Sequence, residues 1–314
     1  MVSKSFETLN SQMIMPEILY QPINRRRFLT VSSKAIASLA VVRTMVTMAA
    51  DATSEKAVHL ALLSDTHFPS DPQFQNRKFF PVENLKLVMS QVAEARPQGV
   101  ILNGDLARSA GELEEYVAIK KALNPLTELT PIYMALGNHD NRENFLKIFE
   151  EPSGARQKVA GKHVLVVEYS VIRFILLDSM LYPNKVPGLL GKAQRDWLAG
   201  FLGSSDSRPT VIFVHHTLGE TDNDLLDVER LYQIIGLHKK VKAIFYGHSH
   251  AYSYKKRDGL HLINIPAIGY NFADKEPVGW LDSQFTAEGA ELTLRAFGGN
   301  RADDGKTTSL TWVG

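Results

Sequence analysis

Five short hydrophobic runs recur along the chain, and each ends in polar residues. They are AVHLALLSD (57–65), GVILNGD (99–105), PIYMALGNHD (131–140), TVIFVHH (210–216) and VKAIFYGHSH (241–250). Apolar runs of this length, bounded by turn-forming residues, are typical of buried strands. The pattern predicts five strands with polar side chains at their carboxyl ends.

Segments with helical periodicity separate several of these runs. Apolar residues recur at the spacing of one helix face in residues 82–95, 111–123, 193–202 and 224–235. Strands that alternate with helices indicate α/β architecture with mainly parallel pairing.

The pattern changes after about residue 252 to that of antiparallel hairpins. Residues 253–266 are predicted to turn at Asp258-Gly259, and residues 279–297 at Glu288-Gly289. Residues 53–314 contain no internal repeat, low-complexity tract or Pro/Gly-rich linker. We therefore expect residues 53–314 to form a single domain.

Residues 1–52 differ in character from the rest. NRRRFLT (24–30) precedes the apolar stretch AIASLAVV (35–42), and Ala50 and Ala52 fit a small-residue cleavage pattern. The segment resembles a twin-arginine signal, which implies recognition by the twin-arginine export machinery and a periplasmic or cell-envelope location. The alternative is a basic amphipathic helix. The apolar run is shorter than the ~20 residues of a membrane span, so we expect no stable span in the mature chain.

Composition excludes several kinds of site. The chain has no cysteine, so thiolate metal sites, cysteine nucleophiles and disulfides are ruled out. Its 35 Lys and Arg nearly balance 34 Asp and Glu, so nothing indicates the basic stripe that a nucleic-acid duplex requires. Any metal ion must be held by nitrogen and oxygen.

The polar residues at the strand ends form the candidate site. In open α/β sheets, ligands bind beyond the carboxyl ends of the strands. The five predicted strands deliver these residues to that edge: Asp65, His67, Asp105, Asn138, His139, Asp140, His215, His216, His248 and His250.

Five motifs carry a family resemblance. DTH (65–67), GD (104–105), GNHD (137–140), VHH (214–216) and GHSH (247–250) resemble, in order and spacing, those of the calcineurin-like metallophosphoesterases. The resemblance covers about residues 57–296 and implies a four-layer sandwich of two mixed β-sheets flanked by helices. GNHD followed by Asn141-Arg142 looks most like the cyclic-nucleotide, or class III, phosphodiesterase branch.

The resemblance also implies a metal centre. Two divalent or trivalent ions (Mn, Fe, Zn or Co) suit a set of carboxylate, imidazole and amide ligands. Asp65, His67 and His250 would hold the first metal; Asn138, His215 and His248 would hold the second; Asp105 would bridge them. His216 is expected to pack beside the ligands rather than bind a metal.

The implied mechanism is in-line attack of metal-bound hydroxide on phosphorus. His139 is placed to bind a phosphoryl oxygen or to protonate the leaving oxygen, with Asp140 fixing its tautomer. Asn138 and Arg142 are the other candidate substrate contacts. For Arg142, a surface position at the start of a helix is an equal alternative.

The expected function is hydrolysis of a small-molecule phosphodiester, such as a cyclic nucleotide or a glycerophosphodiester. An exported phosphomonoesterase with the same site is the alternative, and a non-catalytic binding module or a nuclease is a weaker one. Phe68, Phe79 and Phe80 could stack on a base, although packing is the more common use of phenylalanine.

Overall fold

The computed structural model describes residues 56–150 and 153–313. The predicted export signal in residues 1–52 lies outside the described residues, and so does the boundary predicted after it. Among the helices that the structure describes, none combines the length and apolar character needed to cross a membrane.

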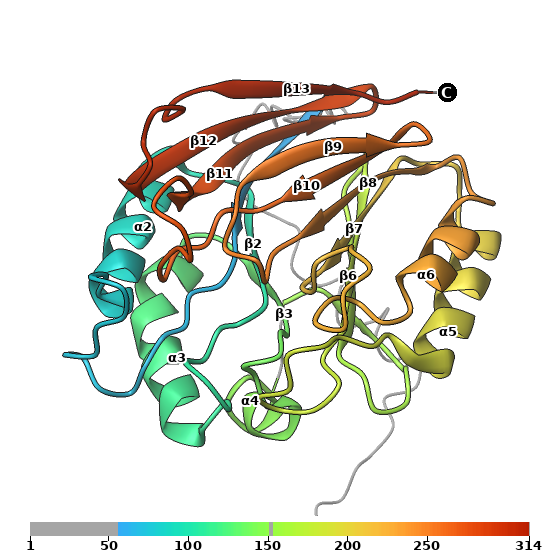
Figure 1. The fold of residues 1–314 in the computed structure, drawn as a ribbon. Coiled ribbons are helices and arrows are strands. Elements are labelled where there is room, and N and C mark those ends of the chain that lie inside the picture. The colour runs from blue at the N-terminus through green and yellow to red at the C-terminus, as the bar shows by residue number, and fades with distance from the viewer. Residues whose placement is uncertain (1–55, 151–152, 314) are drawn as a thin grey trace, which may run out of the picture. The chain divides into compact units, whose positions relative to one another are not determined.

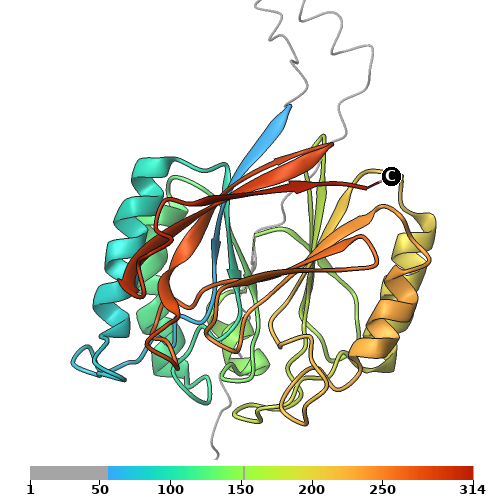
Figure 2. The same cartoon turned by 45° about the horizontal axis from the view of Figure 1, so that its top comes forward.

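Two β-sheets lie face to face at the centre of the described chain, and helices cover their outer faces (Figure 1). This is the predicted α/β sandwich of two mixed sheets, so the expected fold class is confirmed. After a 45° turn, Figure 2 shows the helices as two outer layers with both sheets between them.

The first sheet has the strand order β13-β12-β11-β1-β2-β3. Strands β1 to β3 pair in parallel, and β11 joins β1 in antiparallel orientation. Its strands are β1 (Ala57–Leu63), β2 (Gly99–Asn103), β3 (Ile132–Ala135), β11 (Pro277–Thr286), β12 (Gly289–Gly299) and β13 (Thr307–Thr311).

The second sheet has the order β4-β5-β6-β7-β8-β10-β9. Strands β6, β7, β8 and β10 pair in parallel, and antiparallel strands flank them. Its strands are β4 (Ala155–Gln157), β5 (Val164–Glu168), β6 (Arg173–Leu177), β7 (Thr210–Val214), β8 (Val241–Tyr246), β9 (Ser253–Arg257) and β10 (Leu260–Asn264).

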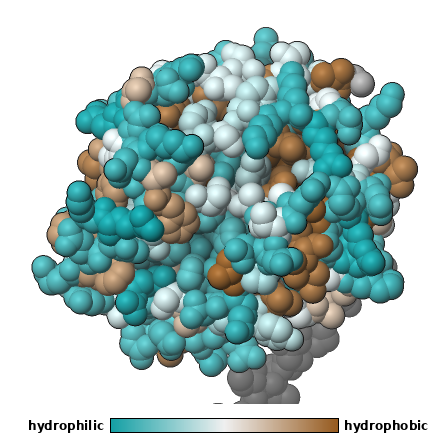
Figure 3. Space-filling view, viewed as in Figure 1, coloured by the Kyte–Doolittle hydropathy of each residue, from teal (hydrophilic) through white to brown (hydrophobic). Residues whose placement is uncertain are grey.

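Five helices in the described ranges form the outer layers. Three cover the first sheet: α2 (Pro81–Ala95), α3 (Leu113–Thr127) and α4 (Arg142–Ile148). The second sheet is covered by α5 (Gly191–Ser204) and α6 (Val228–Ile235). Most of the face in Figure 3 is hydrophilic, as expected when helices turn their apolar sides inward.

Three apolar clusters follow from this layering. One lies between the two sheets and includes Leu62, Phe213, Phe245 and Phe285, all buried. The others lie between each sheet and its own helices. The central strands are buried on both faces, which explains why they appear in the sequence as continuous apolar runs rather than as alternating patterns.

The structure adds elements that the hydrophobic pattern did not predict. Strands β4, β5, β6 and β13 were not expected as elements, and the short helix α4 was expected only through the alternative that places Arg142 at a helix start. The predicted hairpins are present as β9–β10 and β11–β12, but the second turns at residues 287–288, one position earlier than expected. Helix α3 continues through Pro125, and α6 begins at Val228 rather than at residue 224.

Candidate metal centre

The seven expected ligands converge at one edge of the two sheets. The carboxyl ends of β1, β2 and β3 supply four of them, and those of β7 and β8 supply the other three: Asp65 and His67, Asp105, Asn138, then His215, and His248 and His250. Backbone hydrogen bonds tie the segments together, with the Asp65 amide donating to the Gly104 carbonyl (3.1 Å) and the Gly247 amide to the His215 carbonyl (2.8 Å).

One half of the centre consists of Asp65, His67 and His250. The Nε2 atoms of His67 and His250 are 2.9 Å apart, and Nε2 of His250 lies 3.4 Å from Oδ1 of Asp65. All three side chains are buried, and their ligand atoms lie close enough together to hold one metal ion. This is the group expected for the first metal.

The other half contains Asp105, Asn138, His215 and His248. Nε2 of His215 lies 3.3 Å from Oδ2 of Asp105, and Nδ1 of His248 lies 2.8 Å from Oδ1 of Asn138. Oδ2 of Asp105 is also 3.6 Å from Nε2 of His67, in the first half. The Asp105 carboxylate therefore lies between the two halves, where a bridging ligand is expected.

Backbone carbonyls fix the orientation of three ligand rings. In each ring, Nδ1 faces a carbonyl oxygen and so carries the proton, which leaves the lone pair on Nε2 for a metal. The pairs are His67 with Arg108 (3.2 Å), His215 with Asn103 (2.8 Å) and His250 with Tyr270 (2.5 Å).

The electrostatics of the centre favour a bound cation. Burial alone would lower the pKa of His215, but the carboxylates of Asp105 and Asp65 outweigh it and raise that pKa to about 10. Burial lowers the pKa of His67 to about 4, so its imidazole is neutral at neutral pH. Nε2 of His215 is buried and has no hydrogen-bond partner among the described residues. With a pKa of about 10 the free ring is protonated, and the two carboxylates that favour a proton at Nε2 equally favour a metal ion in its place.

The backbone at these strand ends is strained. Few residues other than glycine adopt a positive φ, and such strain clusters at functional sites. Five of the seven expected ligands have a positive φ: Asp65 (53°), His67 (44°), Asp105 (49°), His248 (71°) and His250 (50°).

Two glycines of the motifs are required by close contacts with the ligands. A Cβ atom at Gly137 would clash with the side chain of Asp105, and one at Gly247 would clash with Ser64 and with Asp65. The glycines of GNHD and GHSH thus let these loops approach the carboxylates.

His139 lies at the edge of the centre. Its amide donates to Oδ1 of Asp105 (2.8 Å), and its Nδ1 contacts the Ser109 carbonyl (2.7 Å). The ring centroid is 5.1 Å from that of His67. With His67 and Asp105 it forms a further group whose ligand atoms could reach one ion, so its role as a substrate contact stays a prediction.

The expected contact between Asp140 and the His139 ring is absent among the described residues, and this prediction is wrong. Ser109 occupies the position at Nδ1 of His139 instead. Asp140 is fully buried, and burial raises its pKa to about 7. Its carboxylate accepts four hydrogen bonds, from the amides of Gly137 (2.8 Å), Leu106 (3.2 Å) and Ala107 (3.2 Å) and from the Tyr116 hydroxyl (3.0 Å). Asp140 therefore positions the loops that carry the ligands.

Arg142 begins helix α4, as the alternative expected. Its guanidinium binds the buried Asp178 carboxylate through Nε (2.6 Å) and Nη2 (2.9 Å), and Nη2 also donates to the Met180 carbonyl (3.2 Å). This bidentate pair gives Arg142 a structural partner in place of the phosphate. Contact with a substrate stays a prediction.

His216 packs beside the centre, as expected. It is buried, its Nδ1 lies 2.7 Å from the Ser179 hydroxyl, and its ring centroid is 4.8 Å from that of His248. Phe68 is buried in the core under α2 and α3, so it is not exposed for stacking on a base.

The hydrophobic pattern missed three residues at the rim of the centre: Arg77, Tyr270 and Phe272. The ring centroid of Tyr270 lies 4.9 Å from that of His67, and that of Phe272 lies 4.0 Å from that of His250. Residues 265–272 lie outside any strand or helix. No motif in the sequence could have placed them here.

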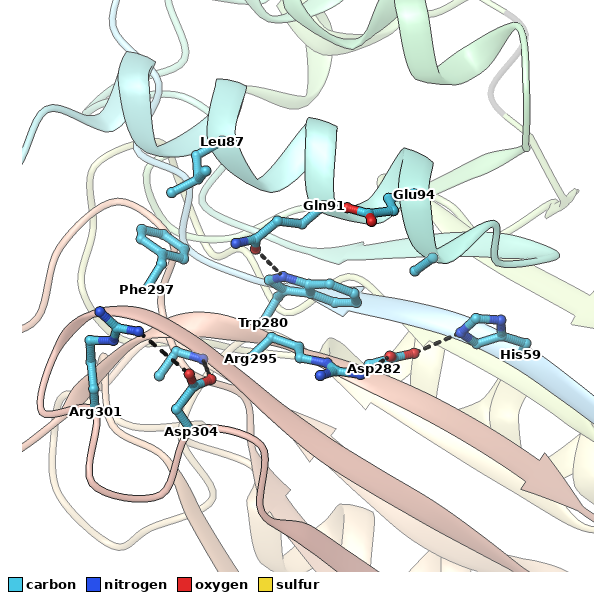
Figure 4. A pocket seen from close by; sticks show the side chains of 12 residues that line it. His59, Leu87, Gln91, Glu94, Trp280, Asp282, Arg295, Phe297, Arg301 and Asp304 are labelled. Atoms are coloured by element: carbon cyan, nitrogen blue, oxygen red, sulfur yellow. Dashed lines mark hydrogen bonds and ion pairs between the residues drawn. The ribbon is translucent and has the colours of Figure 1, made fainter.

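A cavity of about 660 Å³ lies elsewhere, between α2 and strands β1, β11 and β12 (Figure 4). His59, near the amino end of β1, contacts Asp282 (2.6 Å), and Arg295 contacts the same carboxylate (2.9 Å). Arg301 is paired with Asp304. These charged groups pair with one another. The cavity lies at the end of β1 opposite to Asp65, away from the expected ligands.

Comparisons with known proteins agree with the geometry of the centre. A family model described as calcineurin-like phosphoesterase matches residues 58–252. A probable cyclic nucleotide phosphodiesterase of Synechococcus sp. is 28% identical over 238 residues, which cover 74% of this chain and 89% of that protein. A glycerophosphodiester phosphodiesterase of Enterobacter lignolyticus is 26% identical, with 69% of this chain and 81% of that protein covered.

Among solved structures, a dimetal phosphatase from Danio rerio is similar in fold. Its TM-score is 0.63 at 15% identity, with 82% of this chain and 99% of that chain covered. The family match spans more than half of the sequence and contains all five motifs. The chain therefore belongs to the calcineurin-like phosphoesterase family, and it is a metal-dependent phosphoesterase.

Proposed function

We propose that this enzyme hydrolyses phosphodiesters, either cyclic nucleotides or glycerophosphodiesters, at a dinuclear metal centre. The observation that carries the proposal is the position of Asp105 between two ligand groups, with the orphaned Nε2 of His215 beside it. The named activities of the relatives in Synechococcus and Enterobacter support the two substrate classes.

In this proposal, Asp65, His67 and His250 hold one metal and Asn138, His215 and His248 the other, with Asp105 shared. Seven ligands exceed what one ion needs while leaving room for substrate. When bound, the two cations would supply a water nucleophile at neutral pH and neutralise charge on the phosphoryl oxygens.

The chain's own residues position the substrate. Because the Ser109 carbonyl accepts from Nδ1 of His139, only Nε2 of that ring is left to face the substrate. Nε2 donates a hydrogen bond to an oxygen of the phosphate only when the ring is charged. The Asp105 carboxylate, 2.8 Å from the His139 amide, keeps this residue next to the reacting group.

The test compares a diester with a monoester. The Mn²⁺-reconstituted full-length protein is assayed with bis-p-nitrophenyl phosphate and with p-nitrophenyl phosphate, and Asp105→Ala serves as the blank. We expect a clear preference for the diester that disappears in the variant. A preference for the monoester would replace the proposal with a phosphatase function, and no activity on either would refute both.

We also propose that the enzyme is exported, on the basis of the arginines at 25–27 and the apolar stretch after them. An exported enzyme would meet phosphodiesters outside the cytoplasm, which favours scavenging or envelope remodelling over intracellular signalling.

A further inference from the structure

We propose that Phe272 and Arg77 form a subsite for the nucleobase of a cyclic nucleotide, beside the His67–His250 half of the metal centre. This inference rests on the proposed phosphodiesterase function and narrows its substrate class. It concerns the part of the substrate beyond the reacting phosphate.

Phe272 lies directly against a metal-ligand ring. Its ring and that of His250 stack with centroids 4.0 Å apart and planes at 19°. The segment that carries Phe272 also orients this ligand, because the Tyr270 carbonyl lies 2.5 Å from Nδ1 of His250. Phe272 nevertheless remains 49% exposed. An aromatic ring that borders the centre and still faces solvent is placed to meet a substrate group.

Arg77 reaches the same place from the loop after β1. Its Nη1 donates to the Phe272 carbonyl (3.1 Å), and its Cζ lies 5.4 Å from the centroid of the Phe272 ring. No carboxylate among the described residues forms an ion pair with Arg77, so its charge is not offset locally. Two side chains that are 195 positions apart in sequence thus form one surface.

The turn that presents Arg77 is strained. Asn76 and Phe79 exchange two backbone hydrogen bonds (2.9 and 2.8 Å), and Arg77 and Lys78 between them have φ of 46° and 69°. Positive φ at both central positions is the pattern of a type I′ turn, which usually contains Asn-Gly. Long cationic side chains in these positions carry a conformational cost, and such costs are found at functional sites.

The chemistry of the pair favours a nucleobase. Bases stack on aromatic rings and on guanidinium planes, and arginine donates to the acceptors N7 and O6 of a purine edge. The alcohol groups of a glycerophosphodiester offer no planar face to such a pair. With the phosphate at the metal centre, the base is the part of a cyclic nucleotide that extends toward the rim.

The test isolates the base by comparing AMP with ribose 5-phosphate, which differ at C1′, where AMP carries adenine and ribose 5-phosphate carries a hydroxyl. Isothermal titration calorimetry of the Mn²⁺-loaded full-length protein gives a Kd for each. Stacking on one aromatic group predicts that AMP binds about tenfold more tightly. In Phe272→Ala and in Arg77→Ala, the two Kd values should converge through weaker binding of AMP.

Two further variants serve as a conservative substitution and as a control. Phe272→Leu retains an apolar side chain against His250 but loses the aromatic face, so it carries the test if Phe272→Ala loses metal by elemental analysis. Arg96→Ala is the matched control, because Arg96 is exposed with a φ of 53° and lies at the far end of α2. Its Kd ratio should equal that of the unmodified protein.

Several outcomes would overturn the inference. Equal affinities for AMP and ribose 5-phosphate in the unmodified protein would show that no base subsite exists. Equal weakening of both ligands in Arg77→Ala would instead place Arg77 on the phosphate. Because these are binding measurements, they remain readable if neither nitrophenyl ester is hydrolysed, so failure of the proposed function and failure of the subsite are distinguishable.

Discussion

Replacing His139 by alanine separates the role of its backbone amide from that of its imidazole ring. The backbone amide of His139 donates to Asp105, and the substitution retains this bond because it involves only main-chain atoms of residue 139. The ring, in contrast, lies beside that of His67, with centroids 5.1 Å apart. His139→Ala therefore removes the ring while leaving the hydrogen bond to the Asp105 carboxylate in place.

We expect kcat to fall by ~10²-fold or more, the usual scale for loss of a general acid or base. This corresponds to about 2.7 kcal/mol of transition-state stabilisation. The cost in stability should be small, because the ring loses one hydrogen bond, to the Ser109 carbonyl, with a net value of about 1 kcal/mol. The loss of transition-state stabilisation should thus exceed the loss in the free energy of unfolding.

The assay follows hydrolysis of bis-p-nitrophenyl phosphate, with metal content measured by elemental analysis on the same sample. His238→Ala is the matched control, because His238 precedes β8 at the end opposite to the metal centre. The metal content of His139→Ala should equal that of the unmodified protein. Loss of metal together with activity would refute the reasoning, because it would make His139 a ligand alongside His67 and Asp105.

Four other predictions concern metal, folding and location. Removal of metal with EDTA should lower Tm in a thermal-shift assay and Mn²⁺ should restore it, since a ligand of the folded state stabilises that state; an unchanged Tm would count against the centre. Arg142→Gln should lower the free energy of unfolding in urea by about 3 kcal/mol, because it leaves the buried Asp178 carboxylate without its bidentate partner. Unchanged stability with a large loss of activity would instead make Arg142 a substrate contact. Burial lowers the pKa of His163 from 6.5 to about 4, so the unfolded chain binds a proton first as pH falls. His163 should therefore contribute a decrease of up to about 3 kcal/mol in the free energy of unfolding between these pH values, and a pH series in which His163→Asn keeps the full decrease would contradict this. Replacement of arginines 25–27 by lysines should retain the charge but leave the protein in the cytoplasmic fraction of a bacterial host, whereas periplasmic recovery of this variant would argue against twin-arginine export.

The sequence predicts the strands that carry ligands better than those that do not. Strands β1, β2, β3, β7 and β8 combine an apolar run with polar residues at the carboxyl end, and this local signal is enough to place the centre. Strands β5 and β6 are equally buried, but Asp178 after β6 is not part of a recognised motif. The short β4 and the edge strand β13 are largely exposed, so they lack a strong apolar pattern.

The contacts of individual site residues could not be predicted in the same way. Asp140 follows His139 in sequence, which suggested a direct contact, but its carboxylate turns to the Gly137 amide and to the amides of Leu106 and Ala107 in the loop after β2. Arg77 contacts Phe272 because two irregular loops come together, one after β1 and one between β10 and β11. Such contacts are set by the tertiary fold, and local periodicity contains no information about them.

The two histidines of GHSH show how a strained backbone directs neighbouring side chains to different partners. In a regular strand, residues two apart point to the same face, so His248 and His250 would lie side by side. Positive φ at both positions breaks this geometry, and His248 turns to Asn138 while His250 turns to Asp65. Each such residue costs about 1–2 kcal/mol, and replacement by glycine would relieve the strain but remove an expected ligand. In the proposed centre, stability and metal binding therefore make opposite demands on this turn, and its strained geometry is the one that metal binding would require.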